Sequence, residues 1–139
     1  MDTKRVIVIS AAIVLDDQHR LLLVRKQDSD YFMQPGGKID AGETPERALH
    51  RELREELSVT LRSVQYIGTY RAPAANEADH VVCAELFWAM LEGNVRIAAE
   101  IEESRWVSRE DAGRLRLAPL TRDVVLPLVG QRIASSSCT

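Results

Sequence analysis

Cysteine is scarce in this sequence of 139 residues, which contains only Cys83 and Cys138. Two thiols cannot build the disulfide framework of a small secreted protein, so we expect a core thiol at Cys83 and a free thiol at Cys138. No apolar run reaches the ~18 residues that a membrane-spanning helix needs. Met1 and Asp2 lead directly into an apolar segment rather than a secretory signal. These absences predict a cytoplasmic protein without a membrane partner.

Positive charge is not in excess either. Lys and Arg number 18 against 21 Asp and Glu, which gives a net charge of −3 at pH 7. Proteins that bind nucleic acids usually carry a basic patch or stripe, so this balance argues against a nucleic acid as the main partner. A small molecule suits the chain better. If that molecule is a polyanion, an acidic protein must neutralise it locally, with metal ions or with a few placed basic side chains.

The sequence does have the composition of a globular domain. Hydrophobic residues make up 45% of it and charged residues 28%, and a chain of this length can bury one core but not two. We therefore expect residues 1–139 to form a single domain.

Hydrophobic patterns and turn signals predict alternating strands and helices. Strands are expected at Val6–Leu15, Leu21–Lys26, Leu61–Tyr70 and His80–Leu91, with a short one that ends at Trp106-Val107. Helices are expected at Pro45–Leu57, Arg109–Arg114 and Thr121–Ile133, with loops at Gln27–Pro35 and Arg71–Asp79. Pro127 should kink the last helix or delay its start. The tail Ala134–Thr139 is expected to be disordered.

Three glutamates of the first predicted helix share one face. Glu52, Glu55 and Glu56 are spaced i, i+3 and i+4, so their carboxylates repel one another within a single turn. A hard divalent cation would relieve this repulsion, because Mg²⁺ and Mn²⁺ prefer carboxylate oxygens. The spacing therefore indicates a metal site, although three glutamates on a helix face are more often a solvated surface.

The segment 37–59 resembles the Nudix box, Gly-x5-Glu-x7-Arg-Glu-U-x-Glu-Glu-x-Gly-U, where U is a bulky apolar residue. The matching positions are Gly37, Glu43, Arg51, Glu52, Leu53, Glu55, Glu56 and Val59. Ser58 stands where the signature has its late glycine. If that position needs a positive φ, serine tolerates it less easily than glycine. The resemblance implies an α/β/α sandwich around a mixed β-sheet. It also implies a metal-dependent hydrolase that cleaves a phosphoanhydride bond of a nucleoside diphosphate linked to another group.

The resemblance assigns roles within this region. Glu52, Glu55 and Glu56 become the catalytic residues, with Glu52 either a metal ligand or the group that activates water. The implied ligands of Mg²⁺ or Mn²⁺ are Gly36 (through its carbonyl oxygen), Glu52, Glu55, Glu56 and Glu100, with Glu103 the second choice for the last. Glu43 and Arg51 should pair and hold the loop on the helix without touching the substrate.

Substrate contacts rest on weaker patterns. Arg25, Lys26 and Lys38 are candidates for binding phosphate, and Lys26 matches an arginine that grips phosphate in MutT-like members. Thr121 occupies the place of an asparagine that reads oxidised guanine in MutT, and a threonine lacks the paired amide geometry. Tyr31, Phe32 and Tyr70 are candidates either for stacking on a base or for core packing.

The most specific hypothesis is a MutT-like pyrophosphohydrolase of (deoxy)nucleoside triphosphates that requires Mg²⁺ or Mn²⁺. Nucleotide sugars, dinucleoside polyphosphates and capped RNA ends are alternative substrates of the same chemistry. A nucleotide sensor without catalysis is a third reading, which the complete set of box glutamates disfavours. A homodimer, through the long strand His80–Leu91 or an exposed sheet edge, stays open.

Overall fold

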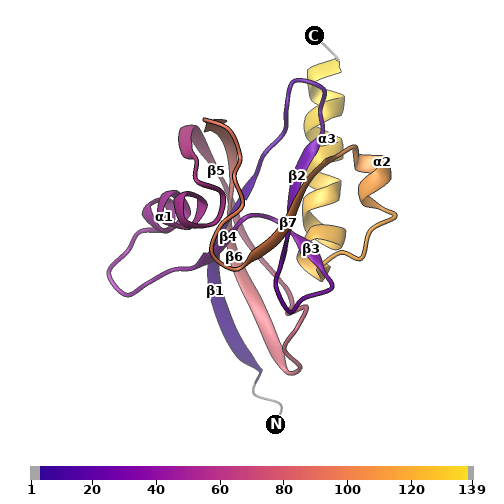
Figure 1. The fold of residues 1–139 in the computed structure, drawn as a ribbon. Coiled ribbons are helices and arrows are strands. Elements are labelled where there is room, and N and C mark those ends of the chain that lie inside the picture. Colours follow the sequence, from indigo (N-terminus) through magenta and orange to yellow (C-terminus); the bar gives the residue numbers. More distant parts are fainter. Residues whose placement is uncertain (1–3, 138–139) are drawn as a thin grey trace.

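The computed structural model describes residues 4–137, and its ribbon is shown in Figure 1. In chain order the elements are β1 (Arg5–Ile13), β2 (Leu21–Lys26), β3 (Phe32–Met33), β4 (Gly36–Lys38), α1 (Pro45–Leu57), β5 (Thr60–Pro73), β6 (His80–Glu92), β7 (Ile101–Val107), α2 (Arg109–Ala112), a π-helical turn (Thr121–Val125) and α3 (Leu126–Ser137). The mixture of helices and strands expected from the sequence is confirmed.

The strands form a mixed sheet with the order β4-β1-β6-β5 and a second, antiparallel sheet with the order β3-β2-β7. The first sheet is mixed because β1 runs parallel to β6 and antiparallel to β4. Backbone hydrogen bonds from Ala12 N–H to the Pro35 carbonyl and from Leu22 N–H to the Val14 carbonyl hold the segments that connect the two sheets. The strand His80–Leu91, considered above for a homodimer, lies within β6 and pairs with β1 and β5, so it is not an edge strand.

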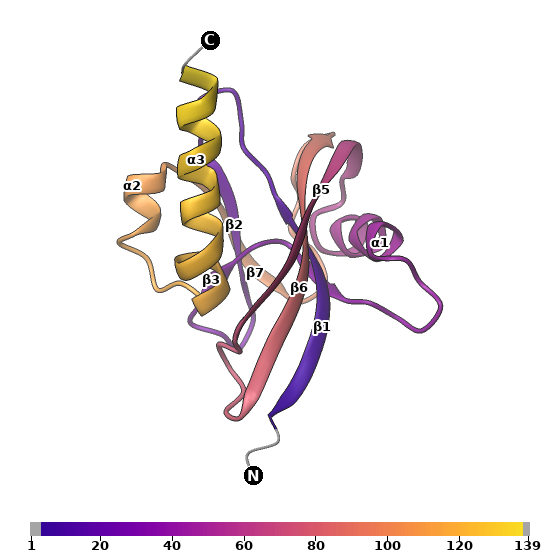
Figure 2. The ribbon, with the colours of Figure 1, turned by 180° about the vertical axis from the view of Figure 1, so that it is seen from behind.

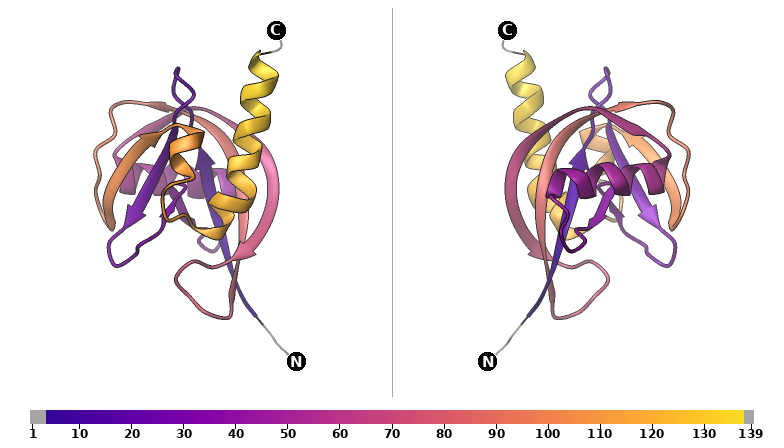
Figure 3. Two further views of the ribbon diagram at one scale, coloured as in Figure 1. Left: turned by 90° about the vertical axis from the view of Figure 1, so that its right-hand side faces the viewer. Right: turned by 90° about the vertical axis from the view of Figure 1, so that its left-hand side faces the viewer.

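Alternation along the strands divides the core into two layers, one on each side of the sheets. One layer gathers Ala11, Ile13, Leu21, Leu23 and Leu86 against Val125 and Val129 of the C-terminal helical segment. The other gathers Ala12, Val14, Leu22, Val24 and Phe87 against Leu49, Leu53 and Leu57 of α1. Figure 2 shows α1 and α3 on opposite sides of the strands, and the side views of Figure 3 show the strands curving between them. This is the sandwich that the sequence predicted.

α1 begins and ends at the predicted residues. The Thr44 side chain accepts a hydrogen bond from Arg47 N–H at 3.2 Å, and Pro45 occupies the first turn, where a missing N–H costs nothing. At the other end Ser58 adopts the left-handed conformation with φ 58°, and its N–H donates to the Arg54 carbonyl. The residue at position 58 therefore does need a positive φ, and serine bears a conformation that costs glycine less.

The irregularity expected at Pro127 is present in the C-terminal helix. Residues 121–125 are π-helical, and α3 starts only at Leu126, directly before Pro127. α3 continues through Ser137, so the expectation of a disordered tail is wrong for Ala134–Ser137. Cys138 and Thr139 lie outside the described residues. Within residues 4–137 no helix is long and apolar enough to cross a membrane.

Two short strands were missed because their own sequence carries little strand signal. The region expected as a loop at Gln27–Pro35 contains β3, and β4 consists of Gly36, Gly37 and Lys38. Both exist only through pairing, β3 with β2 and β4 with β1. Pairing also extends β5 to Pro73, three residues beyond its predicted end, along the partner strand β6.

Candidate active site

Arg51 on α1 is the centre of an ion-pair network. Its Nε lies 2.7 Å from an oxygen of Glu43, and its Nη1 lies 2.9 Å from an oxygen of Glu52. Its Nη2 lies 3.3 Å from Asp40 and donates a hydrogen bond to the Lys38 carbonyl at 3.0 Å. The hydrogen bond from Arg51 is the main reason that the pKa of the Glu43 carboxyl falls to about 2. The expected pair of Glu43 and Arg51 is thus present, and it fastens the loop before α1 to the helix.

Glu56 is the buried member of the carboxylate group, with 5% of its surface exposed. One of its oxygens accepts a hydrogen bond from Gly36 N–H at 3.2 Å, and the other lies 4.0 Å from Lys26 Nζ. Burial is the main reason that the pKa of Glu56 is raised to about 7. The negative charges of Glu52 and Glu100 act in the same direction. Glu100, from the turn before β7, therefore acts electrostatically on the same point as the helix glutamates.

The carboxylate of Glu52 rests against Gly37 of β4. A Cβ atom added at Gly37 would lie 2.5 Å from the carboxyl carbon of Glu52 and 2.6 Å from its Oε2. Any larger residue at position 37 must therefore push this carboxylate away. Glycine at position 37 is thus needed for the position of the Glu52 carboxylate rather than for the fold.

We expect Gly37→Ala to lower the catalytic rate by about 100-fold while the protein stays folded, because a misplacement of about 1 Å is enough for such a loss. The atoms that must move belong to the end of a flexible side chain, so stability should change by less than about 1 kcal/mol. Steady-state kinetics and thermal unfolding test both parts. Gly68→Ala is the matched control, because its Cβ would meet Tyr70 at an ordinary 3.4 Å. Full activity of Gly37→Ala would contradict the contact.

The chemistry of the donors suits a hard divalent cation. The negative charges of Glu52 and Glu100 raise the pKa of the buried Glu56, and a cation would relieve this repulsion. Among the described residues, however, no three Asp, Glu, His or Cys side chains are gathered tightly enough to enclose an ion. Arg51 pairs with Glu52 at 2.9 Å and lies 3.6 Å from Glu55. The side chains are of the chemical type that binds such an ion. Glu52 and Glu55 would have to turn from Arg51 toward it.

A cavity of about 250 Å³ lies between the two sheets, next to the glycines of β4. It is lined by Ile7, Ile9, Ala11, Lys26, Met33, Gln34, Gly36, Gly37, Lys38, Pro73, Ala74, Ala75, Asn76, Glu77, Val82, Ala118, Leu120 and Thr121. Most of the wall is apolar, and Lys26 and Lys38 provide positive charge. The volume is near the lower end of the ~300–1,000 Å³ of small-molecule sites. Gly36 and Gly37 separate this cavity from the glutamates of α1.

Only some of the residues that were predicted to contact a substrate line the cavity. Lys26, Lys38 and Thr121 line it, whereas Arg25 does not. Arg25 points to β7, where its Nε lies 3.1 Å from Glu103, and its Nη1 donates to the Ser29 carbonyl. Arg25 and Lys26 are adjacent in β2, but Arg25 pairs with Glu103 whereas Lys26 lies near Glu56. Glu103, held by Arg25, is correspondingly a poorer ligand candidate than Glu100.

None of the three aromatic candidates lines the cavity. Phe32 is buried in the core, and Tyr70 packs against the same core. Tyr31 lies beneath the guanidinium of Arg116, 5.6 Å from its ring centroid. Core packing therefore explains Phe32 and Tyr70, and surface packing explains Tyr31.

Gln34 is a cavity residue to which sequence reasoning gave no role. Its Oε1 accepts a hydrogen bond of 2.7 Å from the Thr121 hydroxyl, although 87 positions separate the two residues. Both side chains are buried, and both line the cavity. The sequence feature that could have indicated this role is a polar residue directly before Pro35-Gly36-Gly37, where the chain enters β4.

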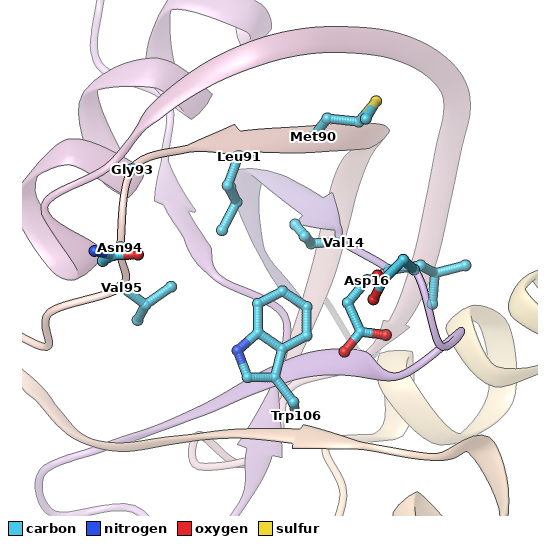
Figure 4. Close-up of a pocket in the computed structure, with 10 residues that line it drawn as sticks. Val14, Asp16, Met90, Leu91, Gly93, Asn94, Val95 and Trp106 are labelled. Carbon is cyan, nitrogen blue, oxygen red and sulfur yellow. The ribbon is translucent and has the colours of Figure 1, made fainter.

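A larger hollow of about 540 Å³ lies elsewhere, and Figure 4 shows the indole of Trp106 within it near Val14 and Leu91. No basic side chain lines this hollow, and its charged residues are Asp16 and Asp17. An anionic ligand would be repelled there. The smaller cavity beside the glutamates is therefore the better candidate site.

The family model of the NUDIX domain matches residues 4–128. With this match, the fold and the arrangement of the box residues, the chain belongs to the Nudix family.

Individual relatives are more distant. A Bacillus subtilis protein is 34% identical over 76% of this chain and 66% of its own length. An 8-oxo-dGTP diphosphatase of Haemophilus influenzae is 42% identical over 40% of this chain and 44% of that protein. An ADP-ribose pyrophosphatase of Methanocaldococcus jannaschii is 22% identical over 73% of this chain and 62% of that protein. The chain thus spans less than two thirds of the length of each of these relatives.

Solved structures support the fold. A MutT NUDIX hydrolase of Burkholderia pseudomallei is 25% identical with a TM-score of 0.67, over 77% of this chain and 86% of that one. A MutT protein of Methanosarcina mazei is 21% identical with a TM-score of 0.77, over 93% of this chain and 96% of that one.

Proposed function

We propose that this protein is a hydrolase of phosphoanhydride bonds, of the MutT-like type, that acts on (deoxy)nucleoside triphosphates with the help of Mg²⁺ or Mn²⁺. A water molecule attacks a phosphorus atom, and the anhydride P–O bond breaks. A nucleoside monophosphate and pyrophosphate are released, and the proton of the water passes to a carboxylate and then to solvent. Membership of the Nudix family and the names of two relatives support this reaction class.

The observation that carries the proposal is the position of the cavity relative to the carboxylates. Gly36 and Gly37 touch both, since Gly36 donates to Glu56, Gly37 contacts Glu52, and both glycines line the cavity. A nucleotide whose base enters the cavity can thus place its phosphates beside the acidic face. Lys26 reaches both regions, because it lines the cavity and lies 4.0 Å from Glu56.

The acidic residues would hold the cation. We assign Glu52, Glu55, Glu56 and Glu100 as its side-chain ligands and the carbonyl of Gly36 as a further one. When bound, a divalent cation supplies charge neutralisation beside the phosphates and a lower pKa for water. Burial raises the pKa of Glu56 in the absence of a metal, and a bound cation would favour the ionised form that serves as a ligand. Lys26 and Lys38 add positive charge for the phosphates.

A nucleotide panel tests the proposal directly. With Mg²⁺, we expect release of pyrophosphate and monophosphate from at least one nucleoside triphosphate, loss of activity in EDTA and recovery when Mg²⁺ or Mn²⁺ is restored. Chromatography identifies the products, and a sample with the metal but without protein is the control. Folded protein that binds no cation and hydrolyses no member of the panel would refute the assignment.

The same panel should include ADP-ribose, nucleotide sugars, dinucleoside polyphosphates and RNA with a 5′-triphosphate. The name of the Methanocaldococcus jannaschii relative is the observation that keeps ADP-ribose as the second candidate. If ADP-ribose is hydrolysed to AMP and ribose phosphate faster than any triphosphate, ADP-ribose becomes the preferred substrate. The type of bond that is cleaved stays the same. Tight nucleotide binding with no product over hours would favour a sensor.

A further inference from the structure

The hollow around Trp106 is separate from the candidate active site. Its volume of about 540 Å³ falls within the ~300–1,000 Å³ of small-molecule sites. Its walls come from residues 14–17 after β1, from the end of β6 with the turn that follows it, and from Trp106 of β7. Trp106 pairs with Leu22 at one end of β2, whereas Lys26 at the other end pairs with Ile101. Four strand residues span about 13 Å, so the two sites lie at opposite ends of the β3-β2-β7 sheet.

Exposed apolar side chains gather in this hollow. Trp106 is 36% exposed and Met90 is 56% exposed, and both line it. In Figure 4 the indole of Trp106 lies between Asp16 on one side and Val95 on the other. Single exposed apolar residues are ordinary on a protein surface, but several of them within one concavity are typical of a binding site.

Trp106 also lacks a partner that other rings of this protein have. Three rings each have an arginine guanidinium at 4.6–5.6 Å from the ring centroid, namely Tyr31 with Arg116, Phe32 with Arg105 and Trp88 with Arg132. No arginine or lysine within residues 4–137 lies over the ring of Trp106. Tryptophan is the side chain whose ring attracts cations most strongly. The indole surface in the hollow is therefore available to a cation from solution.

The charge of the hollow has the sign that suits a cation. Its charged residues are Asp16 and Asp17. The Asp16 carboxylate is held in place, because it accepts hydrogen bonds from Gln18 N–H at 2.9 Å, from Arg20 N–H at 2.8 Å and from Arg20 Nε at 2.7 Å. Arg20 offsets the charge of Asp16, so Asp17 supplies the net negative charge. The side chain of Asp17 is exposed and has no ion pair in the described part of the chain.

We propose that this hollow binds a small organic cation with a fully alkylated ammonium group, which packs against the indole of Trp106 and is attracted by Asp17. The attraction combines the electron-rich face of the ring with the charge of a nearby carboxylate. The site goes beyond the proposed hydrolysis and uses none of the residues that were assigned to it.

The hydrogen bonding of the walls determines the kind of cation. A primary ammonium or a guanidinium group brings several N–H donors, and each must find an acceptor when it leaves water. The Asp16 oxygens already accept three hydrogen bonds, and Val14, Leu91 and Val95 have no acceptor in their side chains. An alkylated ammonium donates no hydrogen bond and presents methyl groups to the ring and to the apolar walls. A divalent metal ion needs six or so oxygen ligands, which these walls do not offer.

Titration with choline and with tetramethylammonium tests the proposal, at constant ionic strength. We expect a Kd on the order of 1 mM for choline, and binding about 10-fold weaker or more for its neutral analogue with carbon in place of nitrogen. Ethanolamine, which has the same body and a primary ammonium, should also bind more weakly, by about 5-fold. In ¹H–¹⁵N NMR spectra the indole N–H signal of Trp106 should shift. That of Trp88, which lies outside the hollow under Arg132, should not.

Substitutions provide the second part of the test. Trp106→Leu should weaken choline binding by about 10-fold or more, and Asp17→Asn by about 3-fold. The matched controls are Tyr66→Leu, which removes an exposed ring outside the hollow, and Glu46→Gln, which removes one exposed negative charge from α1. Both controls should keep the original affinity, and thermal unfolding verifies that every variant is folded.

Three results would overturn the proposal. One is equal affinity for choline and its neutral analogue, which would mean that the hollow responds to shape and not to charge. Another is unchanged affinity in both Trp106→Leu and Asp17→Asn. The third is the absence of binding by either cation at concentrations about 100-fold above the expected Kd. Since binding is the only readout, none of these results depends on whether the protein hydrolyses nucleotides.

Discussion

Replacing Glu55 with glutamine is expected to lower kcat/KM on the preferred nucleotide by about 100-fold or more. The side chain is 56% exposed, and the ion pair that it forms with Arg51 spans 3.6 Å. Glutamine keeps its shape and loses only the negative charge that would bind a cation. Activity should therefore fall while the unfolding midpoint stays within about 2 °C of the original. Steady-state kinetics and thermal unfolding measure the two quantities.

Glu46→Gln is the matched control for this experiment. Glu46 lies on the same helix, in its first turn, and is exposed. It takes no part in the acidic face, so its removal should leave the rate unchanged. Calorimetric titration with Mn²⁺ adds a readout that does not depend on turnover, and we expect weaker binding in Glu55→Gln only. Equal rates in the two variants would remove Glu55 from the mechanism.

Gly36→Ala is expected to have the largest effect on stability, a loss of about 4 kcal/mol or more. Gly36 has φ +151°, and an added Cβ would collide with the carbonyl oxygen of Ser10 and lie 2.7 Å from the Cα of Ala11. These are backbone atoms of the neighbouring strand, so they cannot turn aside as a side chain can. Either β4 separates from β1 or the mixed sheet distorts. Urea unfolding followed by circular dichroism measures the loss.

Substitution of a second glycine separates the two causes of this stability loss, which are backbone strain and steric collision. Gly93 also has a positive φ, +105°, but an added Cβ there would meet nothing within 4 Å. Gly93→Ala should therefore cost only the backbone strain, about 1–3 kcal/mol. Similar losses at both positions would show that the collision at Gly36 is relieved at no cost.

Predictions from the sequence were reliable where a single segment of the chain contains all the residues that determine the feature. The limits of α1 followed from Thr44, Pro45 and the leucine spacing, because capping and amphipathic burial act within a few residues. The spacing of Glu52, Glu55 and Glu56 likewise placed three carboxylates on one face without knowledge of the fold. β4 was missed because two glycines and a lysine have no strand preference of their own.

Arg25 illustrates a different limit. Its position beside Lys26, at the end of the second predicted strand, made it a further candidate for binding phosphate. The register of β2 against β7 places Arg25 opposite Glu103, and a register shift before Lys26 leaves Lys26 opposite Ile101 and at the cavity. Register is a property of two strands together, so one strand's sequence does not determine it.

By itself, the sequence determined the family, the mixed architecture and the acidic helix face. The family and the architecture were implied by the resemblance of the segment 37–59, and the acidic face follows from the spacing of three glutamates on one helix. Only the tertiary structure decided that Glu56 is buried against Gly36, that Arg51 holds Glu52, and that Gln34 meets Thr121. Contacts between residues far apart in the chain depend on how the two sheets and the helices pack. The environment of a polar group, which sets its pKa and its free hydrogen bonds, is fixed by that packing.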